Sequence, residues 1–367
     1  MNVPGARVLV RMPNWLGDIV MAMPAVGAIR RAFPEGRLIA AGPRFASGLL
    51  AMMPGVDEVV ALDGGSAWSL VRGTHGDIAA LAGARADVAI LLTNSFGSAL
   101  AVRRAGVGER WGYARDGRTW LLTKAVTRAA AATADPGALA GAGEHHHARY
   151  YARLVAALGM PVTVADTARL DVTGGPTAAA TRALERLGWR PGGRLVGLAP
   201  GAAYGQAKRW PPRHVATLVG LLLRDESTAC LLVGAPADRE TGIAIEEHLR
   251  AVHGALSRAP RVINAIGQTS IAELAGLMTL IDVLVSNDSG AMHVASAAGV
   301  PVVALFGPTR ETETHPLGTH VLLTEDVFCR PCLMRECPID HRCLTRIAPD
   351  RVADAVARVR RPVETRA

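Results

Sequence analysis

The chain has 367 residues, half of them apolar, and a formal net charge of +8. This length suits two domains of ordinary size, and the apolar content is sufficient for two buried cores. No dense basic stripe interleaved with aromatic residues occurs, which argues against nucleic-acid binding; the charge favours an acidic substrate or an anionic membrane surface.

The N-terminal stretch "MNVPGARVLVRMPNW" runs directly into an apolar segment typical of a first core strand, so no signal peptide is predicted. No stretch reaches the roughly 18 uninterrupted apolar residues of a membrane span. We therefore expect a cytoplasmic protein whose five cysteines are mostly reduced.

Short apolar runs alternate with amphipathic helical patterns in the first half of the chain. Strands are predicted to begin at Arg7, Arg37, Val56 and Asp87, and stretches such as "IVMAMPAVGAIRRAF" lie between them. Such alternation predicts a parallel sheet with helices on both faces.

The alternation lapses between Arg115 and Glu144, where the Gly/Ala-rich end predicts a mobile loop. A helix is predicted over residues 145–158, then a connection that carries one helix. A second series of strands begins at Leu195 and continues through "TACLLVGAP", "RVINAIG", "VLVSNDSG" and "VPVVALFGPT". The sequence therefore predicts an α/β protein of two Rossmann-like domains facing a central cleft, with ligands at the carboxyl ends of the strands.

The segment "NWLGDIVMAMPA" places Asp18 where the first strand gives way to a helix. A helix N-terminus favours the ionised form of a carboxylate. Asp18 is then either a helix cap or a general base toward an acceptor hydroxyl, and the residue types alone leave both interpretations open.

Two segments of the second half have the composition of phosphate-binding loops. In "PGAAYGQAKRWPP", Lys208 lies at a loop–helix junction, where its compact charge suits a pyrophosphate. In "SNDSGAMH", a strand ends at a helix start whose backbone N–H groups suit a phosphate, and Gly290 permits close approach. The alternatives are a solvated lysine and a plain helix cap by Asp288 or Ser289.

Four cysteines form a C-x2-C-x4-C-x5-C array within "CRPCLMRECPIDHRC". They either bind a metal or cluster, form two local disulfides, or are reduced structural thiols; the spacing matches no standard zinc finger. Cys230 lies in a strand pattern and is predicted to be core. The four cysteines of the array are Cys329, Cys332, Cys337 and Cys343.

Three adjacent histidines, His145 to His147, point in different directions on a helix, which favours an exposed helix start over a metal site.

Together these motifs, with "LLTNSFGSALAVRRAGVGERWGY", resemble the ADP-heptose:lipopolysaccharide heptosyltransferases, and most of all the heptosyltransferases II, along nearly the whole chain. The resemblance implies the GT-B fold and inverting transfer without an obligatory cofactor, although a structural metal at the cysteines stays open. It implies an acceptor-binding domain over residues 1–175, a connection over 176–193 and an ADP-heptose-binding domain over 194–348. The Cys-rich segment 329–343 belongs to the latter, and a C-terminal helix and tail follow over 349–367.

The resemblance also implies roles for individual residues. Asp18 matches the catalytic base and Lys208 the pyrophosphate lysine. Other donor contacts are expected from Asp288, Ser289, Gly290, His293 and Thr269, and the ribose contact from Asp238 or Glu240. On the acceptor side we expect Asn14, Arg103 and Arg104, with further attraction of the acidic core by Arg110, Arg115 and Arg118.

The resulting hypothesis is transfer of heptose from ADP-heptose to the first heptose on a lipid A–Kdo core, at the cytoplasmic face of the inner membrane. Rival hypotheses are heptosyltransferase I or another core-sugar transferase of the same fold, a nucleotide-sugar epimerase, and a metal- or cluster-binding protein built around the four cysteines.

Overall fold

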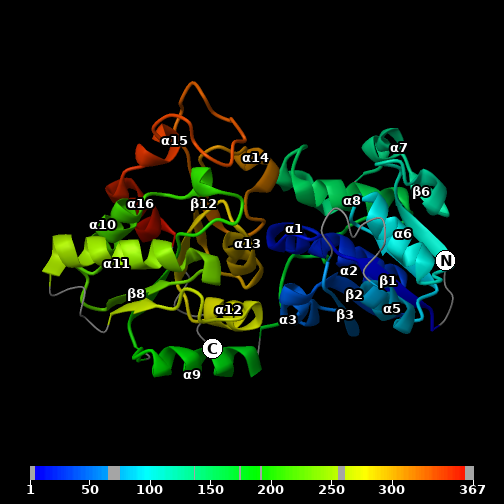
Figure 1. Cartoon of the computed structure of the whole chain (residues 1–367), viewed down its shortest axis with the longest axis horizontal. Coiled ribbons are helices and arrows are strands. Elements are labelled where there is room, and N and C mark those ends of the chain that lie inside the picture. Colours follow the sequence, from blue (N-terminus) through cyan, green and yellow to red (C-terminus); the bar gives the residue numbers. More distant parts are fainter. Residues whose placement is uncertain are drawn as a thin grey trace. The chain divides into compact units, whose positions relative to one another are not determined.

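The computed structural model describes residues 5–64, 75–135, 137–172, 175–190, 192–254 and 261–359. The chain divides into two compact units, Met1–Asp171 and Val172–Ala367 (Figure 1).

The first unit is built around a six-stranded, all-parallel sheet with the order β3-β2-β1-β4-β5-β6. Its central strands are apolar on both faces, as expected of a sheet covered by helices on two sides. The strands are β1 (Arg7–Arg11), β2 (Arg37–Pro43), β3 (Glu58–Leu62), β4 (Val88–Leu91), β5 (Glu109–Tyr113) and β6 (Lys124–Val126).

The helices of the first unit follow the strands in alternation. One of its buried clusters includes Leu9, Ile39, Leu91 and Val102. The helices are α1 (Leu16–Met21), α2 (Met23–Ala32), α3 (Ser47–Ala51), α5 (His75–Gly83), α6 (Phe96–Arg104), α7 (Arg128–Thr133) and α8 (His147–Ala157), with the 3₁₀ turns η1 (Arg44–Ala46), η2 (Thr119–Leu121) and η3 (Gly137–Ala142).

The second unit repeats this plan with the sheet order β12-β11-β10-β7-β8-β9, again all parallel. Read from β9, the order by appearance in the chain is 3-2-1-4-5-6, as in the first unit and in the Rossmann fold. The strands are β7 (Arg194–Ala199), β8 (Thr228–Leu232), β9 (Val262–Asn264), β10 (Val283–Asn287), β11 (Val302–Leu305) and β12 (His320–Leu323).

The last helix of the second unit, α16, closes its core. Val352 and Val356 of α16 are fully buried, and the helix packs against α10. The helices are α9 (Gly175–Arg186), α10 (Pro212–Leu222), α11 (Arg239–His253), α12 (Ile271–Met278), α13 (Gly290–Ala297), α14 (Glu311–Thr314), α15 (Arg342–Thr345) and α16 (Pro349–Arg358), with η4 (Gln206–Lys208) and η5 (Pro236–Asp238).

The prediction of two Rossmann-like α/β domains is confirmed. The region 115–144, predicted to end in a mobile loop, instead contains β6, α7 and η3. Strands β5, β6 and β12 were not predicted from the sequence, because they are short and carry charged or polar residues such as Glu109, Lys124 and His320.

Each sheet reverses its strand order at one point, between β1 and β4 in the first unit and between β7 and β10 in the second. Ligands of doubly wound sheets bind outside the carboxyl ends of the strands at such a switch point. Asp18 follows β1, Lys208 follows β7, and Asp288 follows β10. The predicted site residues thus lie where this architecture binds ligands.

No helix among the described residues is long and apolar enough to cross a membrane.

Candidate active site

Asp18 lies in the first turn of α1, and it does not cap that helix. The N-cap residue is Trp15, and no side chain there bonds to the first turn. The structure therefore removes the interpretation of Asp18 as an N-cap. What remains of a helix role is the favourable interaction of its charge with the helix dipole.

The Asp18 carboxylate is instead bound by two side chains of α8. Tyr151 donates its hydroxyl to Oδ1 at 3.2 Å, and His147 places Nδ1 3.1 Å from the same oxygen. The Asp18 side chain is 22 % exposed and that of His147 is 44 % exposed. The carboxylate is therefore held by α8 and still reaches solvent.

These two contacts are the part of the site that the sequence analysis missed. The histidine motif was predicted to be an exposed helix start. His145 is exposed, but His146 is buried and its Nδ1 accepts the Ala148 N–H as the N-cap of α8, and His147 reaches Asp18. The i, i+4 spacing of His147 and Tyr151 would place both on one helix face, which is the only available sequence signal.

Contacts among Tyr113, Tyr150 and Asn94 help to hold α8 in place. The Tyr150 hydroxyl donates to Asn94 Oδ1 at 3.0 Å, and the Tyr113 hydroxyl donates to the Tyr150 carbonyl at 2.8 Å. The Tyr150 ring packs on Tyr113 and edge-on against Tyr151. Burial, followed by the Asp18 charge, raises the pKa of Tyr151 well above its usual value, so its hydroxyl stays a donor.

The predicted acceptor residues lie in different surroundings. Asn14 is exposed and accepts a hydrogen bond from Arg11 at 2.9 Å. Arg103 and Arg104 are exposed in the last turn of α6, and Arg103 stacks on the exposed ring of Trp120. These side chains are accessible to an acidic ligand.

Two of the arginines expected to attract the acceptor are bound inside the first unit. Arg118 is fully buried and donates to the Tyr113 carbonyl, and its burial lowers its pKa to about 10. Arg110 donates to three main-chain carbonyls, those of Leu121, Val107 and Gly108. Arg118 is therefore too deeply buried to contact an acceptor directly. Arg115, in contrast, is half-buried.

In the second unit, Lys208 and Asp288 form a largely buried ion pair. Lys208 Nζ lies 2.5 Å from Asp288 Oδ2, with side chains 13 % and 7 % exposed. The hydroxyl of Thr309 donates to the same Oδ2 at 2.7 Å, and the Lys208 ammonium lies 4.7 Å from the centroid of the Tyr204 ring. The alternative of a solvated lysine is thus wrong, because Lys208 is held in place by Asp288 and Tyr204.

The start of α13 lies next to this ion pair in the chain. Ser289 is the N-cap residue, its hydroxyl lies 3.2 Å from that of Ser286, and it makes no side-chain cap. Gly290 is the first helical residue, and His293, one turn on, is buried. Backbone N–H groups of such a first turn suit an anion.

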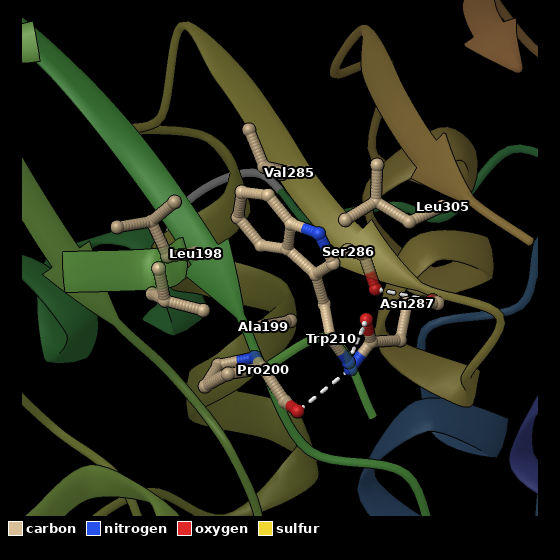
Figure 2. A pocket seen from close by; sticks show the side chains of 9 residues that line it. Leu198, Ala199, Pro200, Trp210, Val285, Ser286, Asn287 and Leu305 are labelled. Carbon is tan, nitrogen blue, oxygen red and sulfur yellow. Dashed lines mark hydrogen bonds between the residues drawn. The ribbon is translucent and has the colours of Figure 1, made fainter. Parts of the chain in front are cut away.

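Asn287 joins the loop of Lys208 to the two central strands, as Figure 2 shows. Its amide nitrogen donates to the Pro200 carbonyl at 2.6 Å, and its amide oxygen accepts the Trp210 N–H at 3.2 Å. The Trp210 indole is buried among Leu198, Val285 and other apolar residues of the drawn pocket. This pocket is apolar packing beneath the loop, and it fixes both ends of the segment that carries Lys208.

The two acidic residues proposed to contact ribose are not equivalent. Asp238 is buried, pairs with Arg209 at 3.1 Å, and accepts the Ala235 N–H at 3.0 Å. A side chain at Gly201 would collide with its carboxylate. Glu240 is exposed in the first turn of α11, and Thr269 is half-buried in the loop before α12.

The Cys-rich segment contacts the Lys208 loop directly. The Arg335 carbonyl accepts the Ala207 N–H at 2.9 Å, the Leu333 carbonyl accepts the Tyr204 hydroxyl at 2.7 Å, and His341 Nε2 lies 2.7 Å from the Ala207 carbonyl. The Cys-rich segment therefore lies directly against the loop that carries Lys208.

The thiols of the Cys-rich segment are free. All five cysteines are unpaired, and Cys230 is buried in the core as predicted. The described residues hold no group of three or more ligands arranged for a metal ion. Burial, followed by the three neighbouring thiols Cys329, Cys332 and Cys337, raises the pKa of Cys343 to about 11.

Two Rossmann-like units, each with charged side chains after its central strands, are the architecture of the GT-B glycosyltransferases. A family model described as glycosyltransferase family 9 (heptosyltransferase) matches residues 78–342. The chain belongs to this glycosyltransferase family and is a heptosyltransferase by class, which removes the epimerase and metal-protein hypotheses as its primary function.

Named relatives agree with this assignment. The chain is 31 % identical to lipopolysaccharide heptosyltransferase 2 of Escherichia coli over 85 % of both chains. It is 28 % identical to lipooligosaccharide heptosyltransferase 2 of Haemophilus ducreyi over 94 % of this chain and 97 % of the relative. The solved structure of ADP-heptose LPS heptosyltransferase II from E. coli superposes with a TM-score of 0.76 at 26 % identity, covering 96 % and 98 % of the two chains.

Proposed function

We propose that this protein transfers heptose from ADP-heptose to the first heptose of a lipopolysaccharide inner core, the reaction of a heptosyltransferase II. The relatives named heptosyltransferase 2 support this assignment. The acceptor is lipid-anchored, so the enzyme works as a peripheral protein at the cytoplasmic face of the inner membrane. No metal or other cofactor is needed for the proposed reaction.

In the proposed step, Asp18 removes the proton from the acceptor hydroxyl as its oxygen bonds to the anomeric carbon of the donor. The bond between that carbon and the diphosphate oxygen breaks with inversion, and ADP leaves with the electron pair. Positive charge near the diphosphate stabilises this leaving group in the transition state. Lys208 and the backbone N–H groups of Ser289 and Gly290 supply it, and His293 lies one turn behind them.

For the donor's nucleoside, we propose Glu240 as the ribose contact, since Asp238 is occupied by Arg209 and by its own turn. Thr269 lies in the loop after β9, beside the loop after β8, because the Gly267 N–H bonds to the Gly234 carbonyl. This neighbourhood supports an adenine contact there. On the acceptor side, Asn14, Arg103 and Arg104 are the accessible candidates.

The observation that carries the proposal is the Asp18 carboxylate, ionisable and partly exposed, at the switch point of the first unit. A carboxylate in reach of a ligand is what an inverting transferase needs as its base.

The test is an assay with purified protein, ADP-heptose and two acceptors, a Kdo core without heptose and the same core with one heptose. Mass spectrometry should find one added heptose only on the second acceptor. Extension of the heptose-free acceptor would identify a heptosyltransferase I instead. A core truncated after one heptose, in a strain that lacks this protein, would support the proposal in the cell.

A further inference from the structure

Helix α8 brings two hydrogen-bond donors to one atom of the proposed base. His147 Nδ1 and the Tyr151 hydroxyl both contact Asp18 Oδ1, at 3.1 and 3.2 Å. A carboxylate only accepts hydrogen bonds, so the proton of the imidazole in this contact lies on Nδ1. Both side-chain contacts of the carboxylate with the described residues fall on Oδ1, and Oδ2 is the oxygen left for a ligand.

The two donors differ in how firmly they are fixed. Tyr151 is buried, and its ring is flanked edge-on by Tyr150. Tyr150 is itself tied to Asn94, which follows β4 at the switch point of the first unit. His147 is the first residue of α8, next to the buried N-cap residue His146, and its side chain is half-exposed. α8 also packs against α1, which carries Asp18.

We propose that His147 and Tyr151 are positioning residues of the transfer reaction: they hold Asp18 through Oδ1 and direct Oδ2 at the acceptor hydroxyl. This inference rests on the proposed role of Asp18 as the base. Neither residue touches the reacting atoms. Each restricts the rotation of a carboxylate that would otherwise turn freely at a partly exposed position, and a misplaced catalytic group costs rate.

The imidazole contact gives a sharp test, because two amides can replace its two nitrogens separately. The Nδ2 of asparagine takes roughly the position of Nδ1, and the Nε2 of glutamine roughly that of Nε2. His147→Ala should lower kcat by about 10- to 100-fold, the scale of a misplaced group, with KM for ADP-heptose unchanged. His147→Asn should restore most of kcat, and His147→Gln should not.

Two controls separate positioning from general damage to the fold. His145→Ala changes an exposed histidine of the same motif and should leave kcat and the melting temperature unchanged. Tyr151→Phe keeps the buried ring and removes only the hydroxyl, so it should lower kcat in the same direction as His147→Ala.

A double-variant cycle distinguishes failure of this inference from failure of the proposed function. If Asp18→Asn lowers turnover by about 10²–10⁴-fold, His147→Ala added to it should have little further effect, because the two changes remove one shared function. If Asp18→Asn is nearly fully active, the proposed base is wrong and so is this inference. If Asp18→Asn is inactive while His147→Ala and Tyr151→Phe keep full kcat, or if Asn and Gln at position 147 behave alike, the base stands and the positioning role is overturned.

Discussion

At the scale of single residues, the Asp18 carboxylate interacts favourably with the dipole of α1 and is still partly exposed to solvent. Its charge lies in the first turn of α1, where the helix dipole contributes roughly 0.3–1 kcal/mol to stability. Its side chain makes no cap and turns to α8. The contribution to stability and the proposed catalytic role can therefore be separated by a substitution that keeps the shape of the side chain.

Asp18→Asn should keep the fold and the affinity for ADP and reduce turnover by about 10²–10⁴-fold, the usual contribution of a positioned base. The measurement is the initial rate with saturating ADP-heptose and core acceptor, alongside a melting curve. Near-normal turnover in a folded variant would show that the acceptor proton goes to another group.

Lys208→Ala should weaken ADP binding by roughly 1.5–3 kcal/mol, the value of a hydrogen bond to a charged group. It should also lower the melting temperature, because Asp288 is left buried without its cation. Calorimetry with ADP measures the first effect. Lys124→Ala, at the other lysine of the chain and in the first unit, is the control; equal ADP affinity of the two variants would remove Lys208 from the donor site.

Asp238 and Glu240 both follow β8, and we expect their substitutions to affect different properties of the protein. Glu240→Gln should weaken ADP binding with an unchanged melting curve, since Glu240 is exposed. Asp238→Asn should lower the melting temperature, since its carboxylate holds Arg209 and the turn η5. The reverse result, a stability defect in the first variant and an affinity defect in the second, would assign the ribose contact to Asp238.

At the scale of elements, the Cys-rich segment is a brace for the loop that carries Lys208. Tyr204 is the link: its hydroxyl donates to the Leu333 carbonyl, and its ring carries both the Lys208 ammonium and the Arg335 guanidinium. Gly205 has a φ of 154°, and a side chain there would collide with the Arg335 carbonyl. The close approach of the two segments thus depends on glycine at that position.

A graded series at Tyr204 tests this brace. Tyr204→Phe removes one hydrogen bond, worth about 0.5–1.5 kcal/mol, and should raise the dissociation constant of ADP a few-fold. Tyr204→Leu also removes the ring beneath Lys208 and should raise it further. Calorimetry measures the dissociation constant of ADP for each variant, and a melting curve shows that each variant is folded. Unchanged ADP affinity in both variants would mean that the brace does not affect ADP binding by the loop that carries Lys208.

The sequence alone predicts strands that are apolar and bounded by Gly, Pro or Asp. It also predicts the site residues that follow such strands in the chain. β1, β7 and β10 were predicted for this reason, and with them the places of Asp18, Lys208 and Asp288. The contacts of Asp18 with His147 and Tyr151 depend on α8 packing against α1, which no local pattern encodes. Arg118 was predicted as surface charge, because nothing in its neighbours indicates that it is buried against Tyr113 and Ser98.

At the scale of the whole molecule, each unit has its own sheet and its own apolar core. One buried apolar cluster of the second unit consists of residues between Val196 and Val356, and one cluster of the first unit consists of residues between Leu9 and Leu122. A core formed within one stretch of chain is the usual mark of a domain that can fold alone. Lys208, Asp288, Ser289 and Glu240 all belong to the second unit.

Residues 172–367 expressed alone should therefore fold cooperatively and bind ADP nearly as well as the whole chain, while showing no transfer. The fragment begins ahead of α9, which packs on α12 and must stay with this unit. A melting curve and calorimetry with ADP are the measurements, and the same fragment with Lys208→Ala is the control for specific binding. A folded fragment that does not bind ADP would move essential donor contacts into the first unit. An unfolded fragment would show that the second core, although built from its own residues, needs the first unit for its stability.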